Sequence, residues 1–336
     1  MERKHRLLYI RHCLRLLALC IASGVSVPMH AQFDASLSGY WDVAGYFNPA
    51  SAGSDDRLYV SSTFSQQMSG FENAPKTMYF GVDAPLQVLR RKQGLGAMFV
   101  NDQLGFFTNM YFGVQYAPQF KFFGGILGVG IQPGMVSVGF DPSKVTVYTE
   151  DGNGNGSVGG NAGTLDPAIP GSKVNGTSFD ASAGLWYTHR LFYAGLSGTH
   201  ILSPLITWDD THEYQVSPTY YLTAGSNIKT KSPFLTLQPS VLVKTNMEQY
   251  KINLTGRATY TINERELTGG LSYSPGTSVT FIAGGMMQNV RLTYCYELFT
   301  NGIGMTHGSH DVVFAYMMDL NFGKNAKNKH KSVRIL

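Results

Sequence analysis

The densest cluster of side chains able to do chemistry follows Trp208. Asp209, Asp210, His212 and Glu213 bring three carboxylates and one imidazole together within five residues. Such a group could hold a metal ion or transfer protons as a general acid and base. Clustered acids beside a histidine are more often simply solvated in an exposed loop. We therefore expect a solvated loop here and keep an enzymatic role for this group as an alternative hypothesis.

A low-complexity Gly/Asn stretch at residues 150–163 contains two short patterns known from ligand-binding loops. Asp151, Asn153 and Asn155 match the start of a calcium loop, in which alternate oxygen atoms surround the ion. The twelfth position is Ala162, where that motif needs a bidentate glutamate. The stretch also reads Gly-x-Gly-x-x-Gly, but it lacks the preceding hydrophobic strand and following helix of a dinucleotide site. We expect a surface loop.

The remaining reactive side chains do not form a nucleophile arrangement. His307 and His310 flank Gly-Ser near the C-terminus, and the chain has no Gly-x-Ser-x-Gly nucleophile elbow. Cys295 is the one cysteine after residue 31, so it cannot form an intramolecular disulfide there. We expect no catalytic residues, no bound metal and no cofactor.

The elements that carry these residues are predicted to be strands. In the segments 251–262 and 290–299, apolar residues alternate with polar ones, which is the period of a β-strand with one apolar face. Such runs extend over about 9–13 residues, longer than most globular strands and long enough for a tilted transmembrane strand. No run of 18 apolar residues follows Val27, which excludes a helical membrane protein.

About fourteen strands are expected, and an even number can close an antiparallel barrel that satisfies every backbone polar group in lipid. The sequence therefore predicts an all-β fold, an antiparallel transmembrane β-barrel of the outer-membrane type, over residues 57–322. The expected strands are 57–66, 76–84, 94–101, 108–117, 122–139, 178–188, 190–200, 214–225, 234–244, 250–261, 265–274, 277–287, 289–299 and 310–322.

The connections between these strands predict the orientation of the barrel. Counting from the first strand, the odd-to-even connections include the longest ones, 140–177, 201–213 and 300–309. The even-to-odd turns, such as 188–190, 262–264 and 287–289, are short. Outer-membrane barrels have long outer loops and short periplasmic turns. Both chain ends are therefore expected in the periplasm, with 140–177 as a long outer loop.

Residues 1–31 have the composition of a signal peptide for the general secretory pathway. Five basic residues against one acid precede an apolar segment that is too short to span a bilayer as a helix. A lipoprotein site at Leu17–Cys20 is only a partial match because Leu19 is bulky. Removing residues 1–31 leaves 21 basic and 21 acidic residues, so the mature chain is near neutral and nucleic-acid binding is not expected.

Two further segments flank the predicted barrel. Residues 32–56 contain too many aromatic residues for a disordered leader, so we expect them to pack on the periplasmic rim or to enter the lumen. Residues 323–336 form a basic tail that the predicted topology places in the periplasm. It is either a solvated terminus or a docking site for an acidic partner. Its basic residues are Lys324, Lys327, Lys329, Lys331 and Arg334.

Five short motifs follow one another along the mature chain. They are Asn48, Pro49, Ala50, Ser51, Ala52 and Gly53; Pro75, Lys76 and Thr77; Asp83, Ala84, Pro85 and Leu86; Gly94, Leu95 and Gly96; and Gly308, Ser309, His310 and Asp311. In order and spacing these motifs resemble those of the PorP/SprF family of the Bacteroidetes type IX secretion system. Ser51 stands where the family usually has an aromatic residue and Asp311 where it usually has glutamate.

This resemblance implies a non-enzymatic outer-membrane protein that supports secretion or surface anchoring of cargo with a C-terminal signal, including adhesins in gliding species. The implied partners are a periplasmic ring lipoprotein and ring protein, a peptidoglycan-binding protein and the cargo. The residues leave one alternative open, a channel or transporter for small or hydrophobic solutes, because about fourteen strands can surround a lumen.

Overall fold

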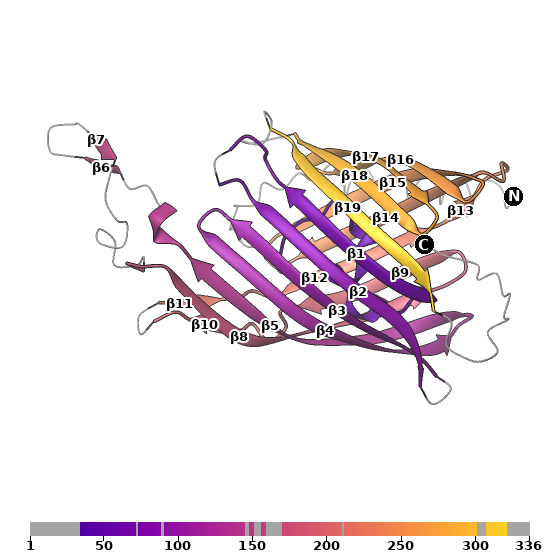
Figure 1. Cartoon of the computed structure of the whole chain (residues 1–336), viewed down its shortest axis with the longest axis horizontal. Coiled ribbons are helices and arrows are strands. Elements are labelled where there is room, and N and C mark those ends of the chain that lie inside the picture. Colours follow the sequence, from indigo (N-terminus) through magenta and orange to yellow (C-terminus); the bar gives the residue numbers. More distant parts are fainter. Residues whose placement is uncertain are drawn as a thin grey trace, which may run out of the picture.

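The computed structural model describes residues 34–71, 73–88, 91–144, 148–150, 156–158, 170–209, 212–300 and 307–320. Within them, fourteen long strands form a closed antiparallel barrel (Figure 1). The strands are β1 (Arg57–Gln66), β2 (Lys76–Val88), β3 (Arg91–Leu104), β4 (Phe107–Phe122), β5 (Gly125–Phe140), β8 (Val174–Thr188), β9 (Phe192–Thr199), β12 (Thr219–Ser226), β14 (Leu235–Thr245), β15 (Tyr250–Ile262), β16 (Arg265–Ser274), β17 (Ser278–Met287), β18 (Val290–Phe299) and β19 (Ser309–Asp319).

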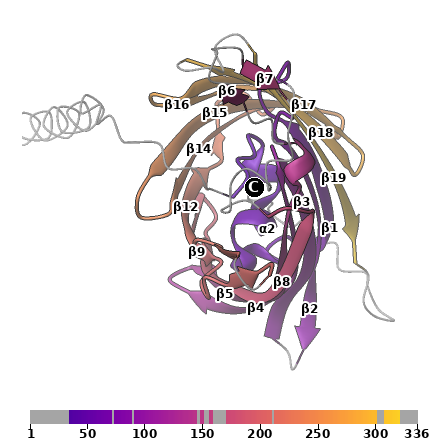
Figure 2. The ribbon, with the colours of Figure 1, turned by 90° about the vertical axis from the view of Figure 1, so that its left-hand side faces the viewer.

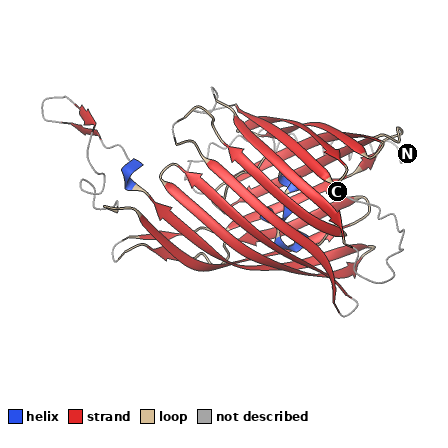
Figure 3. Ribbon diagram, in the orientation of Figure 1, coloured by secondary structure: helices blue, strands red, loops and turns tan. Residues whose placement is uncertain are grey.

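Each long strand pairs with its neighbour in the chain, and β1 closes the ring by pairing with β19. Short elements accompany the barrel, and among the described residues helix is confined to single turns (Figure 3). They are η1 (Tyr40–Asp42), α2 (Ala44–Phe47), η2 (Pro49–Ser51), η3 (Pro142–Lys144), the hairpins β6 (Tyr148–Glu150) with β7 (Gly156–Val158) and β10 (Leu205–Thr207) with β11 (Glu213–Gln215), and β13 (Ile228–Lys229). None of the described helices is long and apolar enough to cross a membrane.

Over much of the barrel wall, apolar side chains lie outside and polar ones inside, the reverse of a soluble protein. Parts of β3 and β5 also carry apolar side chains on their inner face. In β15, Leu254 is 45% exposed while its neighbour Thr255 is 4% exposed. In β4, Phe112 and Val114 face outward, whereas Gln115 is buried. Lipid solvates such an outer surface, and the inward row can hydrogen-bond within the lumen.

The structure corrects several predicted strand boundaries. The strand expected at 122–139 begins at Gly125, because Phe122 ends β4 and Phe123 and Gly124 form the turn at positive φ. The strand expected at 214–225 begins at Thr219, since residues 213–215 form β11 of a separate hairpin. The strands expected at 76–84 and 94–101 are longer, and Pro85 lies inside β2 opposite a glycine of β3.

The connections confirm two unequal ends of the barrel. We call the end with the connections 67–75, 141–173, 200–218 and 300–308 the loop end, and the opposite end the turn end. At the turn end, several of the connections are only two residues long. They include those that follow Phe122, Ile262 and Met287.

Residues 34–56, which we call the plug, lie inside the barrel. Figure 2 looks into the barrel from the loop end and shows α2 surrounded by strands. Tyr40, Val43 and Phe47 are almost fully buried and join the main apolar cluster of the lumen. Of the two placements left open by the sequence, the rim and the lumen, the contacts show the lumen.

The plug runs through the lumen from the loop end to the turn end. At its start, Asp34 contacts Thr199 and Tyr221, which lie where β9 and β12 meet the loop end. Near its end, Gly53 contacts Asp83 close to the turn end, and β1 then begins at Arg57. The described residues of the plug therefore cross the barrel opposite to the direction of β1. Asp34 lies at the end with the long connections, which corrects the expectation that both chain ends lie at the opposite end.

Candidate functional site

The plug is anchored to the barrel wall by the turn at Asn48, which is 1% exposed. Its side-chain Oδ1 accepts a hydrogen bond from the backbone N–H of Ala50 at 2.9 Å, which caps η2. Its Nδ2 donates to the carbonyls of Leu185 in β8 and Leu196 in β9, at 2.9 and 3.3 Å. One asparagine thus shapes the turn and binds it to two strands, and Ser51 completes the turn by donating to the Asn48 carbonyl at 2.8 Å.

The wall beneath this turn is made of glycines, which we call the glycine seat: Gly94, Gly128, Gly130, Gly184 and Gly195. A Cβ placed on Gly130 would lie 2.2 Å from the backbone nitrogen of Ala50, and one on Gly184 would lie 2.2 Å from Asn48 Oδ1. Only a residue without a side chain allows the backbone to approach so closely. The seat is therefore shaped to the plug.

The end of the plug brings three of the predicted motifs together. Gly53 has φ +63°, and its N–H donates to Asp83 Oδ1 at 2.7 Å. A Cβ on Gly94 would lie 1.8 Å from the Ala52 carbonyl oxygen, and Pro85 Cα lies 3.1 Å from a Cβ placed on Gly53. The motifs that begin at Asn48, Asp83 and Gly94 thus form one contact surface near the turn end.

The other two predicted motifs lie near the loop end. Thr77 donates to Asp102 Oδ1 at 2.6 Å, while Lys76 is exposed. Ser309 Oγ accepts from the N–H of Met68 at 3.1 Å. Pro75 borders a cavity there, and Leu86 is half-buried near the other end of β2. The structure therefore does not bring these motifs to the glycine seat.

The last motif also contacts the plug. The Asp311 carboxylate accepts hydrogen bonds from the Ser38 N–H at 2.6 Å and from Ser65 Oγ of β1 at 2.5 Å. His310 is on the outer side of β19, where its Nδ1 is 2.7 Å from the Tyr294 hydroxyl. Asp311 thus fixes the plug beside the β1–β19 closure.

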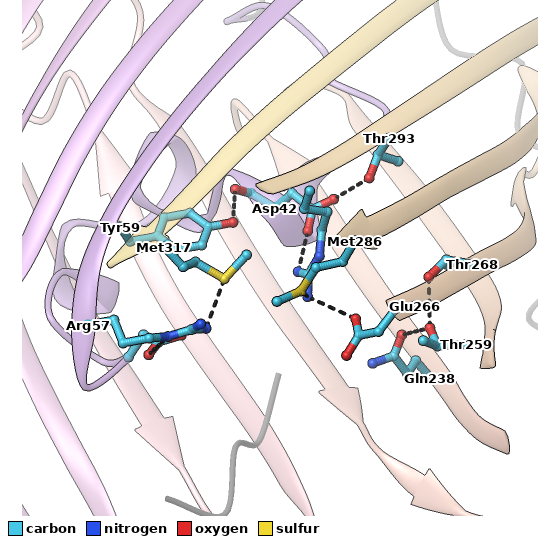
Figure 4. A network of polar contacts seen from close by, with 12 residues as sticks. Asp42, Arg57, Tyr59, Gln238, Thr259, Glu266, Thr268, Met286, Thr293 and Met317 are labelled. Atoms are coloured by element: carbon cyan, nitrogen blue, oxygen red, sulfur yellow. Dashed lines mark hydrogen bonds and ion pairs between the residues drawn. The ribbon is translucent and has the colours of Figure 1, made fainter. Parts of the chain in front are cut away.

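An ion-pair network holds the middle of the plug (Figure 4). Asp42 is 1% exposed; its Oδ1 is 3.0 Å from Arg291 Nη1 and its Oδ2 accepts from Thr293 at 2.9 Å. Arg291 also contacts Glu266 at 3.5 Å, and Tyr59 donates to the Asp42 carbonyl at 2.9 Å. These residues were not among the predicted site residues. The sequence did place two charged residues, Arg291 and Glu266, on the polar faces of predicted strands, and this could have indicated an ion pair in the lumen.

A second charged cluster fixes the start of the plug at the loop end. His200 Nε2 is 3.0 Å from Asp34 Oδ1, and His200 Nδ1 is 2.5 Å from Asp180 Oδ2. Tyr221 and Thr199 donate to Asp34 Oδ2 at 2.7 and 2.8 Å. Lys244 Nζ donates to the Asp34 backbone carbonyl.

This cluster changes the proton affinity of its own members. Burial alone would lower the pKa of His200, but the negative charge of Asp34 and hydrogen bonds to both aspartates outweigh it and raise the pKa to about 10. Burial alone would raise the pKa of Asp34, but the His200 charge and the hydrogen bonds bring it well below its usual range. The two shifts agree, and the pair is charged at neutral pH.

The acidic cluster after Trp208 takes part in a folded hairpin. Trp208 donates its indole N–H to the Val138 carbonyl at 2.8 Å, and Asp209 Oδ1 is 2.8 Å from His212 Nδ1. Glu213 begins β11, and Asp210 lies outside the described residues. Within the described part of the chain, no three His, Cys, Asp or Glu side chains are grouped to hold a metal. The signal segment, most of the Gly/Asn stretch and the basic tail also lie outside the described residues.

The fold and the site together define an outer-membrane β-barrel whose lumen contains an N-terminal plug. Residues 29–316 match the family described as type IX secretion system membrane protein PorP/SprF. The chain belongs to this family. No curated protein matches the sequence significantly.

Solved outer-membrane barrels are similar to this chain at low sequence identity. The CymD monoaromatic hydrocarbon channel has a TM-score of 0.47 and 10% identity, covering 87% of this chain and 95% of its own. A TodX monoaromatic hydrocarbon channel mutant has a TM-score of 0.44 and 11% identity, covering 83% and 94%. The KdgM porin has a TM-score of 0.30 and 11% identity, covering 77% and 98%.

Proposed function

We propose that this protein is a non-enzymatic outer-membrane part of the type IX machine that supports secretion or surface anchoring of cargo with a C-terminal signal. The single observation that carries the proposal, beside family membership, is that the plug occupies the lumen and is bonded to the wall at the loop end, the middle and the turn end. A barrel occupied in this way is suited to anchoring partners at its ends.

The two ends differ in ways that favour different partners. Long connections at the loop end, which we place outside the cell, offer surface for cargo. The turn end and the basic tail, with Lys324, Lys327, Lys329, Lys331 and Arg334, would face the periplasm. There we propose contacts with a ring lipoprotein, a ring protein and a peptidoglycan-binding protein. Export of the chain would use the signal segment 1–31.

Deletion of the gene tests this role. We expect C-terminal-signal cargo to accumulate in the cells and to disappear from the surface and medium, and the wild-type gene to restore it. The alanine variant of Gly256, a lipid-side glycine of β15 with open space around its Cα, serves as the matched control and should also restore secretion. Normal cargo display in the deletion strain would rule out the proposed role.

A diffusion channel is the second candidate function that the barrel itself raises. The contacts of the plug argue against steady conduction, because Asn48 and the glycine seat fill the wall side of the lumen near the turn end. Steady single-channel conductance of the intact protein in planar bilayers would instead favour this second function.

A further inference from the structure

A cavity of about 480 Å³ lies near the loop end of the lumen, between the start of the plug and the inner face of β3, β4, β5 and β8. Tyr46 of the plug forms one side, and Met98, Val100, Val136 and Val138 from the wall form the other. Protein interiors ordinarily contain few voids larger than a water molecule. A space of this size falls in the range of small-molecule sites, about 300–1,000 Å³. It therefore needs an explanation other than imperfect packing.

The walls of the cavity are mostly apolar. Met98, Val136 and Val138 are buried side chains of the main apolar cluster, and Tyr46 and Tyr111 present ring surfaces. Water is a poor occupant of such a space because a buried water needs two to four polar partners. A largely hydrocarbon molecule would remove this apolar surface from water at no loss of hydrogen bonds.

Most polar groups that border the cavity already have partners. Gln132 donates to the Tyr111 hydroxyl at 2.9 Å, and Asp102 accepts from Thr77. The exceptions among the described residues are Asn109 Oδ1 and Ser182 Oγ, which are buried and make no hydrogen bond. Both oxygens can accept a hydrogen bond, which favours a ligand with a hydrogen-bond donor.

The charges around the cavity restrict the ligand further. Two carboxylates, Asp34 and Asp102, border it together with one imidazole, that of His200. His200 is already paired with Asp34, so the second carboxylate leaves the surroundings acidic. An anionic ligand would lose its hydration and meet like charge.

We propose that this cavity binds a small neutral molecule, mostly hydrocarbon, with a hydrogen-bond donor. The site is bounded by the plug, β3–β5, β8 and the loop end. The inference is independent of the proposed role in secretion, since it depends only on the volume and chemistry of the cavity.

Binding of 2-naphthol at pH 7 to the full chain in lipid nanodiscs tests the proposal by equilibrium dialysis against empty nanodiscs. We expect saturable binding, weaker binding of naphthalene because it lacks the donor, and no saturable binding of the anion 2-naphthoate. Uptake equal to that of empty nanodiscs, or binding of 2-naphthoate as tight as that of 2-naphthol, would overturn it.

A pair of variants places the binding in the cavity. Val136→Trp fills the space from the inner face of β5, whereas Met135→Trp adds the same side chain to the lipid face one residue away. We expect Val136→Trp to weaken 2-naphthol binding by about tenfold or more, and Met135→Trp to bind like the wild type. If Val136→Trp does not fold, Val100→Phe fills the same cavity from β3. Unchanged binding in a folded cavity-filling variant would contradict the proposal.

Discussion

Single residues hold the plug through charge as well as packing, and His200 gives this a pH signature. It faces Asp34 of the plug, Asp180 of β8 and the ring of Tyr111 in β4. Its pKa is about 10 in the folded protein against 6.5 for the free side chain. A raised histidine pKa contributes stability that is fully present below pH 6.5 and is lost as the pH rises toward 10.

We therefore expect the start of the plug to become more accessible between pH 6.5 and pH 10 in the wild type. His200→Gln should lose this pH dependence and show high accessibility throughout. Hydrogen exchange of the peptide around Asp34, compared between the two proteins at each pH, measures the effect. The same pH dependence in both proteins would show that His200 does not hold the plug.

Asp42 is the residue whose loss should loosen the middle of the plug most. Asp42→Asn keeps the size of the side chain but leaves the partly buried Arg291 guanidinium with one ion pair, the longer one to Glu266. We expect a decrease of about 1–3 kcal/mol in the stability of the plugged state. The measurement is a denaturant titration in which the protease sensitivity of the plug is the readout. Asp56→Asn, which removes one partner of an exposed ion pair, is the control. Equal stability of the two variants would argue against the network.

At the scale of elements, the glycine seat and η2 depend on each other. Gly94→Ala would place a Cβ 1.8 Å from the Ala52 carbonyl oxygen, a backbone atom that cannot move without shifting the turn. We expect the stability of the plugged state to fall by about 1–3 kcal/mol and the turn to be released from the wall. Gly256→Ala has nothing within 4 Å and should behave like the wild type.

Limited proteolysis in nanodiscs compares these two glycine variants. Faster cleavage within residues 34–56 is expected for Gly94→Ala alone, with the barrel still folded as judged by its heat-modifiable migration. Cleavage at the same rate in both variants would mean that the seat does not retain the plug.

The strands could be predicted from the sequence because a barrel wall in lipid has one apolar and one polar face, as in the alternation around Leu254 and Thr255. The predicted strand ends were less accurate where proline or glycine interrupts the alternation. The strand predicted to end at residue 84 continues through Pro85, because Pro85 pairs with Gly94, whose lack of a side chain accommodates the proline. The plug contacts could not be predicted in this way, since they join Asn48 to the carbonyls of Leu185 and Leu196, which are 137 and 148 residues away. Motif resemblance identified Asn48, Gly53 and Asp83, but only the fold shows that they meet.

On the scale of the whole molecule, the protein is a barrel with a plug in its lumen, and we propose that its two ends bind partners. If the plug closes the lumen, the intact protein should show no steady conductance in planar bilayers. Deletion of residues 34–52 should then open an ion-conducting pore. Equal conductance of both proteins would show that the plug does not control passage.

The most direct test of the central claim is affinity purification of the tagged protein from detergent-solubilised outer membranes, with mass-spectrometric identification of what co-elutes. We predict enrichment of a periplasmic ring lipoprotein, a ring protein, a peptidoglycan-binding protein and C-terminal-signal cargo. We also expect weaker recovery of the periplasmic partners when the basic residues of the tail are replaced by glutamine, at Lys324, Lys327, Lys329, Lys331 and Arg334. Recovery of the same proteins with an unrelated tagged barrel, at the same abundance, would contradict it.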